Sequence, residues 1–273
     1  MDTYGVLFGL TFVFYAASCL GYLSFFITQR QRLGFFGFLA AIAGFWAQTI
    51  MLVSRALVLK YPPVSNLYES LLFFAWIIIL VYLLVEYRPK NWVNGVFVLP
   101  LVVLLTGYAM LLDSNVRPLS PALKSPWLGI HTSLCFLGYA CFLMAFCFGI
   151  MYLWQEKEVK SKRPDVFFFR LPALGLVDRL GYRCVAFGLI FLTLGIITGS
   201  VWAQKAWGSF WNWDPKETSS LVMWLVYLVY LHGRLIAGWR GRKSAYIAII
   251  GFLTMLFTYF GVSFLLPGLH SYF

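Results

Sequence analysis

The chain has 273 residues, of which 61% are hydrophobic and only 11% are charged, and its mean hydropathy is +0.80. A soluble domain carries about 25% charged residues, so this composition excludes an ordinary soluble globular protein and indicates a membrane protein. The formal net charge of +11 is better explained by retention of Lys and Arg on the cytoplasmic side of a membrane than by nucleic-acid binding.

Eight apolar runs are long enough to cross a bilayer as helices, because a transmembrane helix needs about 20 mostly apolar residues. In chain order they cover 4–28, 34–54, 67–86, 93–112, 129–154, 183–202, 218–238 and 244–266. The first run follows Asp2 and has no basic segment before it, so it is predicted to be a span and not a cleaved signal peptide. The predicted fold class is therefore all-α, a polytopic membrane protein with eight transmembrane helices.

Lys and Arg are distributed unequally between the two sides that eight spans define. Fifteen of the 21 fall on one side and six on the other. The six are Arg55, Lys60, Arg117, Lys124, Lys205 and Lys216. Because basic residues accumulate on the cytoplasmic side, this asymmetry predicts that both termini are extracytoplasmic.

Two connecting segments are longer than the others. Residues 155–182 begin with many charges, and the part from 167 to 180 mixes aromatic, leucine and charged residues, as a short interfacial helix on the cytoplasmic side does. Residues 113–128 contain three prolines and are expected to be extended or turn-rich on the outer side. The five cysteines form no C-x-x-C pair, so they are interpreted as small buried apolar side chains.

The three histidines stand at informative positions. His131 begins the fifth predicted span on the outer side, and His270 follows the eighth span on the same side. Two such imidazoles can ligate a haem iron, although an interfacial histidine can also serve only as a hydrogen-bonding group. His232 lies within the seventh span, about 21 Å from its outer end at 1.5 Å per residue. There it is either an iron ligand on the inner side or a partner in a helix–helix hydrogen bond.

The outer loop before the seventh span is unusually rich in tryptophan, with the sequence WGSFWNWDPKE at 207–217. Its tryptophans are Trp207, Trp211 and Trp213. They are more concentrated than the scattered aromatic belt of membrane interfaces, and they predict a flat apolar surface suited to a macrocycle. Asp214, Pro215 and Glu217 fit the N-cap, N1 and N3 positions of a helix, which sufficiently explains both acids.

These residues resemble a known family. WGSFWNWDPKET resembles the tryptophan-rich WWD motif of the haem-handling proteins of cytochrome c maturation. PVSNLYESL at 63–71 and RLPALGLVDRLGYR at 170–183 resemble segments of the CcsA/ResC branch of the type II system. The resemblance implies a membrane subunit of a cytochrome c synthetase. Such a subunit exports haem b and presents it outside for thioether attachment to the C-x-x-C-H motif of apocytochrome c.

The resemblance also implies a role for each of these residues. His131 and His270 would ligate the iron of haem b in an outer site, and His232 would hold it on the inner side. The loop at about 202–217 would hold the macrocycle through Trp207, Trp211, Trp213 and Asp214. Since the chain has only three histidines, the fourth ligand is expected from a CcsB/ResB-type partner. Residues 1–273 would then form a single haem-handling membrane domain.

The remaining expectations concern the membrane, the partners, the propionate-binding residues and the competing functions. The implied membrane is the bacterial inner membrane or, for a plastid protein, the thylakoid membrane. Thiol-reducing thioredoxin-like proteins and membrane lipid are further expected partners, and nucleic acid is not. Arg55, Lys205 and Lys216 are candidates for binding the haem propionates, and no catalytic residue is assigned. A haem-b electron carrier, a transporter of another substrate and a HemX-like protein of haem synthesis are the competing interpretations.

Overall fold

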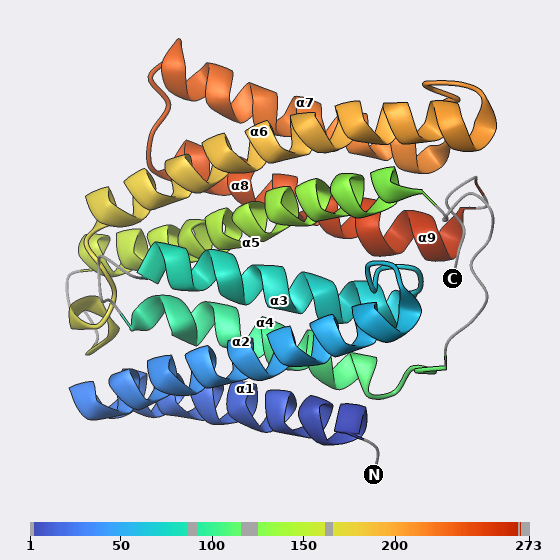
Figure 1. Cartoon of the computed structure of the whole chain (residues 1–273). Coiled ribbons are helices and arrows are strands. Elements are labelled where there is room, and N and C mark those ends of the chain that lie inside the picture. Colours follow the sequence, from blue (N-terminus) through green and yellow to red (C-terminus); the bar gives the residue numbers. More distant parts are fainter. Residues whose placement is uncertain (1–2, 87–91, 116–124, 162–165, 267, 269–273) are drawn as a thin grey trace. The chain divides into compact units, whose positions relative to one another are not determined.

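The computed structural model describes residues 3–86, 92–115, 125–161, 166–266 and 268 (Figure 1). Within these residues every regular element is a helix, which confirms the predicted all-α class. The chain divides into two compact units. Unit 1 comprises Met1–Arg117 with Phe169–Leu171, and unit 2 comprises Pro118–Phe168 with Pro172–Phe273. That the two act as one haem-handling domain stays a prediction.

Unit 1 is built from four helices. They are α1 (Thr3–Thr28), α2 (Gln31–Leu59), α3 (Leu67–Glu86) and α4 (Val93–Ala109). Helix α1 packs against α2 and α4, and α3 packs against α4 and α2. Buried hydroxyl groups join these helices: Tyr15 donates to Gln48 at 2.6 Å, and Tyr82 donates to Tyr22 at 2.6 Å. Such interhelical hydrogen bonds are a usual way to hold helices together where lipid surrounds them.

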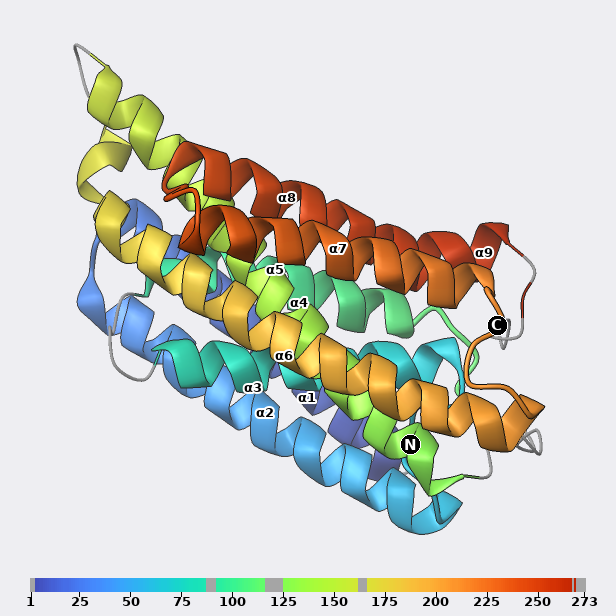
Figure 2. The same ribbon diagram turned by 90° about the horizontal axis from the view of Figure 1, so that it is seen from above.

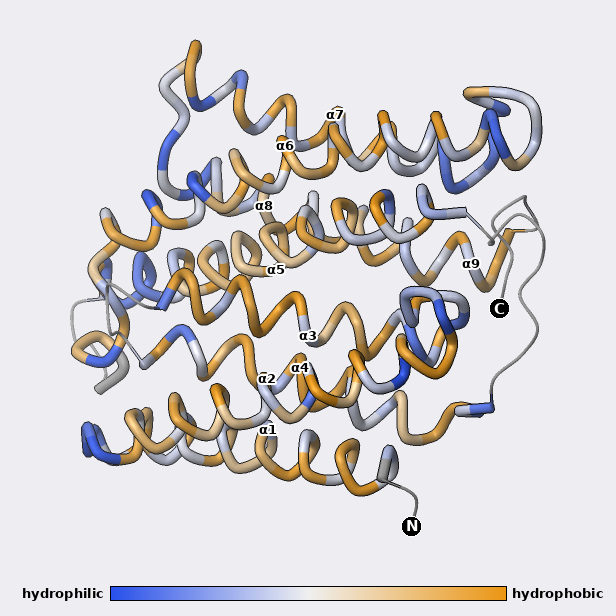
Figure 3. Tube along the Cα trace, viewed as in Figure 1, coloured by the Kyte–Doolittle hydropathy of each residue, from blue (hydrophilic) through white to orange (hydrophobic). Residues whose placement is uncertain are grey.

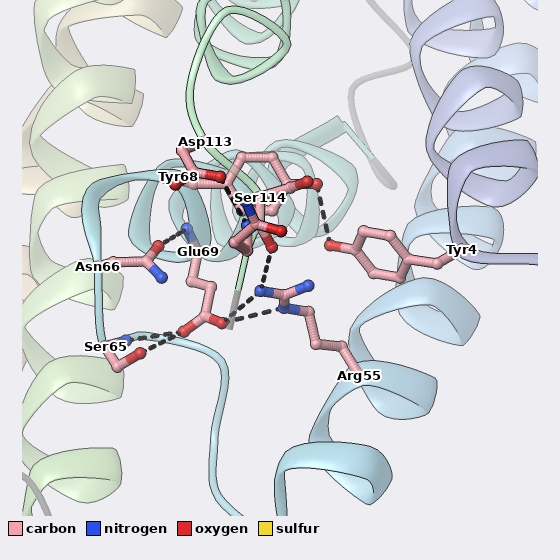
Figure 4. A network of polar contacts seen from close by, with 9 residues as sticks. Tyr4, Arg55, Ser65, Asn66, Tyr68, Glu69, Asp113 and Ser114 are labelled. Carbon is pink, nitrogen blue, oxygen red and sulfur yellow. Dashed lines mark hydrogen bonds and ion pairs between the residues drawn. The ribbon is translucent and has the colours of Figure 1, made fainter. Parts of the chain in front are cut away.

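An ion-pair network closes the end of unit 1 where α2 stops and α3 begins (Figure 4). The Arg55 guanidinium donates from Nε to Glu69 Oε1 at 2.9 Å and from Nη2 to the Ser114 carbonyl at 2.9 Å. Glu69 also accepts bonds from the backbone and hydroxyl of Ser65, and the Arg55 guanidinium lies 5.1 Å from the Tyr4 ring centroid. A buried ion pair needs such additional hydrogen bonds to offset its loss of hydration.

Unit 2 carries the remaining helices. They are α5 (Pro126–Lys160), α6 (Leu174–Trp207), α7 (Pro215–Leu235), α8 (Arg242–Leu256), the π-helical turn η3 (Phe257–Gly261) and α9 (Val262–Leu265). Helix α5 packs along α6, and α8 packs against both α5 and α7 (Figure 2). Glycines allow the α5–α6 pair to approach closely: a Cβ at Gly138 would lie 3.1 Å from the Gly188 carbonyl oxygen. Small residues have this effect wherever membrane helices touch.

Six helical segments are long and apolar enough to cross a membrane, with α8, η3 and α9 counted as one. They are Tyr4–Thr28, Gln31–Leu59, Leu67–Glu86, Pro126–Lys160, Leu174–Trp207 and Arg242–Leu265. Helix α4 is apolar but shorter, and α7 has polar residues at both ends (Figure 3). The protein is therefore a multi-pass membrane protein, whereas the count of eight spans stays a prediction. Some counted basic residues lie outside the described residues: Arg88, Lys90, Arg117, Lys124, Lys162 and Arg163.

The predicted interfacial helix over 167–180 does not form as a separate element. The segment is divided between a four-residue 3-10 helix, η2 (Val166–Phe169), and the first turns of α6, which begins at Leu174. Pro172 lies between the two, and proline disfavours helix at the residue before it. From Leu174 onward no proline follows within α6, so the polar turns continue directly into the apolar helix.

Candidate functional site

His131 lies near the start of α5 and its ring is held by α6. The distance from His131 Nδ1 to the Gly195 carbonyl oxygen is 2.8 Å. Because a carbonyl oxygen only accepts, Nδ1 carries the proton of the neutral ring and Nε2 is the nitrogen with a lone pair. The ring also stacks on Trp202, with centroids 5.8 Å apart and planes 25° apart. The tautomer and the orientation of His131 are thus set by α6.

Two glycines on α6 make room for this histidine. A Cβ at Gly199 would lie 2.7 Å from His131 Nδ1, and a Cβ at Gly195 would lie 2.7 Å from Cys135 Sγ. Both distances are too short for real carbon contacts, so only glycine lets α5 approach here. The two glycines form a G-x-x-x-G pattern in an apolar run, which is the sequence signal of a close helix–helix contact.

The tryptophans form an aromatic cluster from the end of α6 into the following loop. Trp202 is 2% exposed and its ring lies 5.1 Å from that of Trp207, while Trp211 meets Trp213 edge-on at 5.8 Å. Gly208 ends α6 with a φ of 75°, and Trp213 has a φ of 55°, a region that non-glycine residues rarely adopt. Trp213 is 71% exposed, so the loop presents an indole to its surroundings. Trp202, which connects the loop to His131, was not among the predicted site residues.

The predicted capping box at the start of α7 is confirmed. The Asp214 carboxylate accepts from Lys216 N at 2.9 Å, and Glu217 Oε2 accepts from Asp214 N at 3.2 Å. Glu217 Oε2 also accepts from Asn212 N at 2.8 Å. Asp214 is 6% exposed, so it anchors the loop and is not a surface group. These bonds fix the point at which the tryptophan loop turns into α7.

The C-terminal segment reaches the same loop. A Cβ at Gly268 would contact the Asp214 carboxylate and would lie 3.3 Å from Pro215 Cδ. His270, the second predicted iron ligand, is two residues further along and lies outside the described residues. The structure therefore brings together His131, the tryptophan loop and Gly268 at one end of unit 2.

His232 is separate from this cluster. It lies 17 residues after Pro215 on α7, which corresponds to about 26 Å of helix at 1.5 Å per residue. The side chain is exposed, and among the described residues its ring has no hydrogen-bond partner. The neighbouring Arg234 behaves differently, because its guanidinium forms two bonds to Asp178, of 2.7 and 2.6 Å. His232 is thus placed on an outer face of unit 2.

The three candidate cations have different environments. Arg55 is engaged by Glu69 in unit 1, as described above. Lys205 is exposed, with its Nζ 5.3 Å from the Trp127 ring centroid. Lys216 is half-buried, and its Nζ donates to Ser263 Oγ at 3.0 Å. Removal of the ammonium from water lowers the pKa of Lys216 from 10.5 to about 8, although Asp214 acts in the opposite direction.

The fold and this cluster together define a class: a multi-pass, all-helical membrane protein with an oriented histidine beside a tryptophan-rich loop. The family described as "Cytochrome C assembly protein" matches residues 64–270. A cytochrome c biogenesis protein CcsA of Heterosigma akashiwo is 39% identical over 248 residues, covering 78% of this chain and 77% of the relative. Its namesake in Guillardia theta is 36% identical over 283 residues, covering 96% and 94%. The chain belongs to this family, as a CcsA-type cytochrome c biogenesis protein.

A solved structure supports the fold assignment. The chain is similar to a protein named "Cytochrome c Heme Lyase CcmF", with a TM-score of 0.62 and 19% sequence identity. The similarity covers 94% of this chain and 46% of the lyase, so the chain spans about half the length of that protein. At this identity the likeness concerns the fold alone.

Proposed function

We propose that this protein is the membrane subunit of a cytochrome c synthetase that exports haem b and presents it for attachment to apocytochrome c. The observation that carries this proposal is the hydrogen bond from His131 Nδ1 to the Gly195 carbonyl. Histidines that ligate metals usually donate their other ring N–H to a carbonyl or carboxylate, which fixes the tautomer and makes the ligating nitrogen more basic. His131 has this arrangement, which would leave Nε2 to ligate the iron.

The surroundings of His131 also suit a porphyrin. The aromatic cluster of Trp202, Trp207, Trp211 and Trp213 offers flat apolar contact to the macrocycle. His270 would supply the second ligand of this outer site, and Gly268, two residues before it in the chain, lies beside Asp214 of the tryptophan loop. Lys205 and Lys216 are the remaining candidates for binding the propionates.

The membrane orientation follows from the charge distribution. With eight spans, fifteen basic residues fall on the cytoplasmic side and six on the other. Both termini are then extracytoplasmic, together with His131 and the tryptophan loop. The membrane is the bacterial inner membrane or, for a plastid protein, the thylakoid membrane.

His232 supplies one ligand of an inner haem site. An exposed imidazole within a membrane-spanning segment is unfavourable unless something covers it. A CcsB/ResB-type partner that contributes a second histidine covers it and completes the coordination. Haem then moves from this site, near the cytoplasmic side, to the outer site at His131.

The reaction itself is thiol addition to the haem vinyl groups. A carbon–sulfur bond forms as the vinyl π bond breaks, and the thiol hydrogen ends on the neighbouring vinyl carbon, so no net oxidation occurs. The thiols of the C-x-x-C-H motif belong to the substrate and are kept reduced by thioredoxin-like proteins. The contribution of this chain is to hold haem beside them, since positioning alone supplies large rate factors.

Single alanine substitutions at the three histidines test the proposal. Haem spectra of the purified complex and the yield of holocytochrome c are measured for His131→Ala, His270→Ala and His232→Ala. We expect the first two to lose the outer-site spectrum and the third to lose the inner-site spectrum, each with a large fall in yield. Thr132→Val is the matched control, because among the described residues the Thr132 hydroxyl bonds only within α5. Unchanged haem content and unchanged yield in both His131→Ala and His270→Ala would defeat the proposal.

A further inference from the structure

Trp213 has a backbone conformation that a bulky residue rarely adopts. Its φ is 55°, in the left-handed region, where a side chain of this size is strained. Among the described residues, Gln29 and Lys60 are the other non-glycine residues with a positive φ. Each of these directly follows the end of a helix, where a left-handed residue is common. Trp213 instead precedes the N-cap of α7, so the ending of a helix does not explain its conformation.

The carboxylate of Glu217 bonds to the backbone on both sides of Trp213. One oxygen, Oε2, accepts from Asn212 N at 2.8 Å and from Asp214 N at 3.2 Å. The capping box requires only the second of these bonds. Two N–H groups converge on one anion in this way when the residue between them is left-handed, as in the anion-binding turns known as nests. Thr218 Oγ1 also donates to the Trp213 carbonyl at 3.3 Å, so the peptide group that follows Trp213 is held at both its N–H and its carbonyl.

This backbone fixes the direction of an exposed indole. Trp213 is 71% exposed, and its ring meets that of Trp211 edge-on at 5.8 Å. Phe210 in the same loop is 60% exposed and has no positive φ, so exposure of an aromatic ring here does not require a strained backbone. Strained residues cluster at ligand-binding sites, where neighbouring bonds hold them in place. The conformation of Trp213 therefore indicates that the direction of its ring, and not only its exposure, matters for binding.

We infer that Glu217 is a positioning residue of the tryptophan loop: its carboxylate holds Trp213 in the left-handed conformation and so presents a fixed indole to a flat aromatic macrocycle. The inference rests on the proposed function, in which this macrocycle is the porphyrin ring of haem. The contact is between aromatic ring systems and does not involve the iron, so it does not depend on the histidine ligands. Contacts between aromatic rings depend on their direction, and an indole that is already fixed loses little conformational entropy when the ligand binds.

Two substitutions of Trp213 test the backbone conformation in the ligand-free protein. Trp213→Gly and Trp213→Ala remove the same indole, but only glycine adopts a positive φ without strain. We expect a higher unfolding temperature for Trp213→Gly than for Trp213→Ala, the reverse of the usual order. This advantage of glycine should disappear in a Glu217→Ala background, because the bonds that impose the conformation are then absent. A lower unfolding temperature for Trp213→Gly, or an advantage that persists without Glu217, overturns the inference.

Binding of iron-free protoporphyrin IX tests the role of the fixed indole. The purified protein is placed in lipid nanodiscs, and the affinity is measured from the fluorescence of the porphyrin. We expect the affinity to fall several-fold in Trp213→Gly and in Glu217→Ala, and to stay near the wild-type value in Glu217→Gln, whose amide oxygen still accepts hydrogen bonds. Phe210→Ala is the matched control, because it removes another exposed aromatic ring from the same loop. An unchanged affinity in Trp213→Gly or Glu217→Ala, or an equal fall in Phe210→Ala, overturns the inference.

Failure of this inference is distinguishable from failure of the proposed function. The iron-free porphyrin has no metal to ligate, so its affinity does not report on His131. If His131 is not an iron ligand, His131→Ala keeps the haem spectrum while the affinity for the iron-free porphyrin still falls in Glu217→Ala. If Glu217 serves only as a cap, the haem spectrum depends on His131 and the iron-free porphyrin binds Glu217→Ala and Glu217→Gln equally well.

Discussion

Each of the two units holds a cation among its helix ends, and the two cations are paired differently. Arg55 in unit 1 binds the carboxylate of Glu69 at 2.9 Å, with Glu69 only 1% exposed (Figure 4). Lys216 in unit 2 donates to the neutral hydroxyl of Ser263 at 3.0 Å. The Glu69 carboxylate balances the charge of Arg55 directly, whereas the Lys216 ammonium is bonded to a hydroxyl and interacts also with the Asp214 carboxylate. The comparison assigns Arg55 to holding unit 1 together, and it places Lys216 where the first turn of α7 meets α9.

The largest expected effect is on the free energy of unfolding, which should fall much more when Arg55 is replaced than when Lys216 is replaced. Arg55→Leu leaves the Glu69 carboxylate buried without its opposite charge, which costs about 3–5 kcal/mol. Lys216→Met removes an ammonium that is already poorly hydrated, so a much smaller loss is expected. Thermal unfolding of the purified protein in detergent measures both. Equal destabilisation by the two substitutions would contradict the comparison. The double substitution Arg55→Leu with Glu69→Leu is expected to recover most of the stability, because no unpaired charge is then left buried.

The next largest effect is expected at Gly199, where a substitution tests whether unit 2 binds haem through His131. Gly199→Ala places a Cβ 2.7 Å from His131 Nδ1, so the ring has to move from the position set by Gly195. We expect a several-fold loss of haem retained at the outer site, because sub-ångström positioning governs such sites. Haem content per protein measures this loss. Gly9→Ala is the control, since no neighbouring side chain or helix in the described part of the chain lies within 4 Å of a Cβ added there. An equal loss in both variants would contradict the account.

A smaller effect is expected at the start of α7. Asp214→Ala removes the N-cap, which typically costs about 1 kcal/mol, and it loosens the tryptophan loop. Glu217→Gln keeps an oxygen acceptor for the Asp214 backbone N–H and is expected to cost less. Unfolding midpoints of the two variants measure the difference. A larger loss in Glu217→Gln would show that the capping box is not what anchors the loop.

Local sequence patterns were sufficient to predict those features that depend on residues adjacent in the chain. The Asp214 capping box could be predicted because the cap, Pro215 and Glu217 are adjacent in the chain and satisfy the same helix end. The prediction of a separate interfacial helix over 167–180 was wrong. Amphipathic composition alone does not show that the turns from Leu174 continue without a break into the apolar part of α6.

The parts that could not be predicted depend on contacts between helices. Trp202 is separated from His131 by 71 positions in the sequence, and only the packing of α5 on α6 brings the two rings together. The G-x-x-x-G pattern at Gly195 and Gly199 is typical of a close helix–helix contact, but it does not show that the contact accommodates His131. The assignment of His270 stays a prediction, since that residue lies outside the described part of the chain.

The most direct measurement of the central claim is low-temperature electron paramagnetic resonance of the oxidised complex in a His232→Ala background, where the outer site alone contributes. The account predicts a low-spin signal typical of two imidazole ligands, which is lost or converted to a high-spin signal when either His131 or His270 is replaced by alanine. A low-spin signal that survives both replacements would contradict it, because the iron would then be held by other groups.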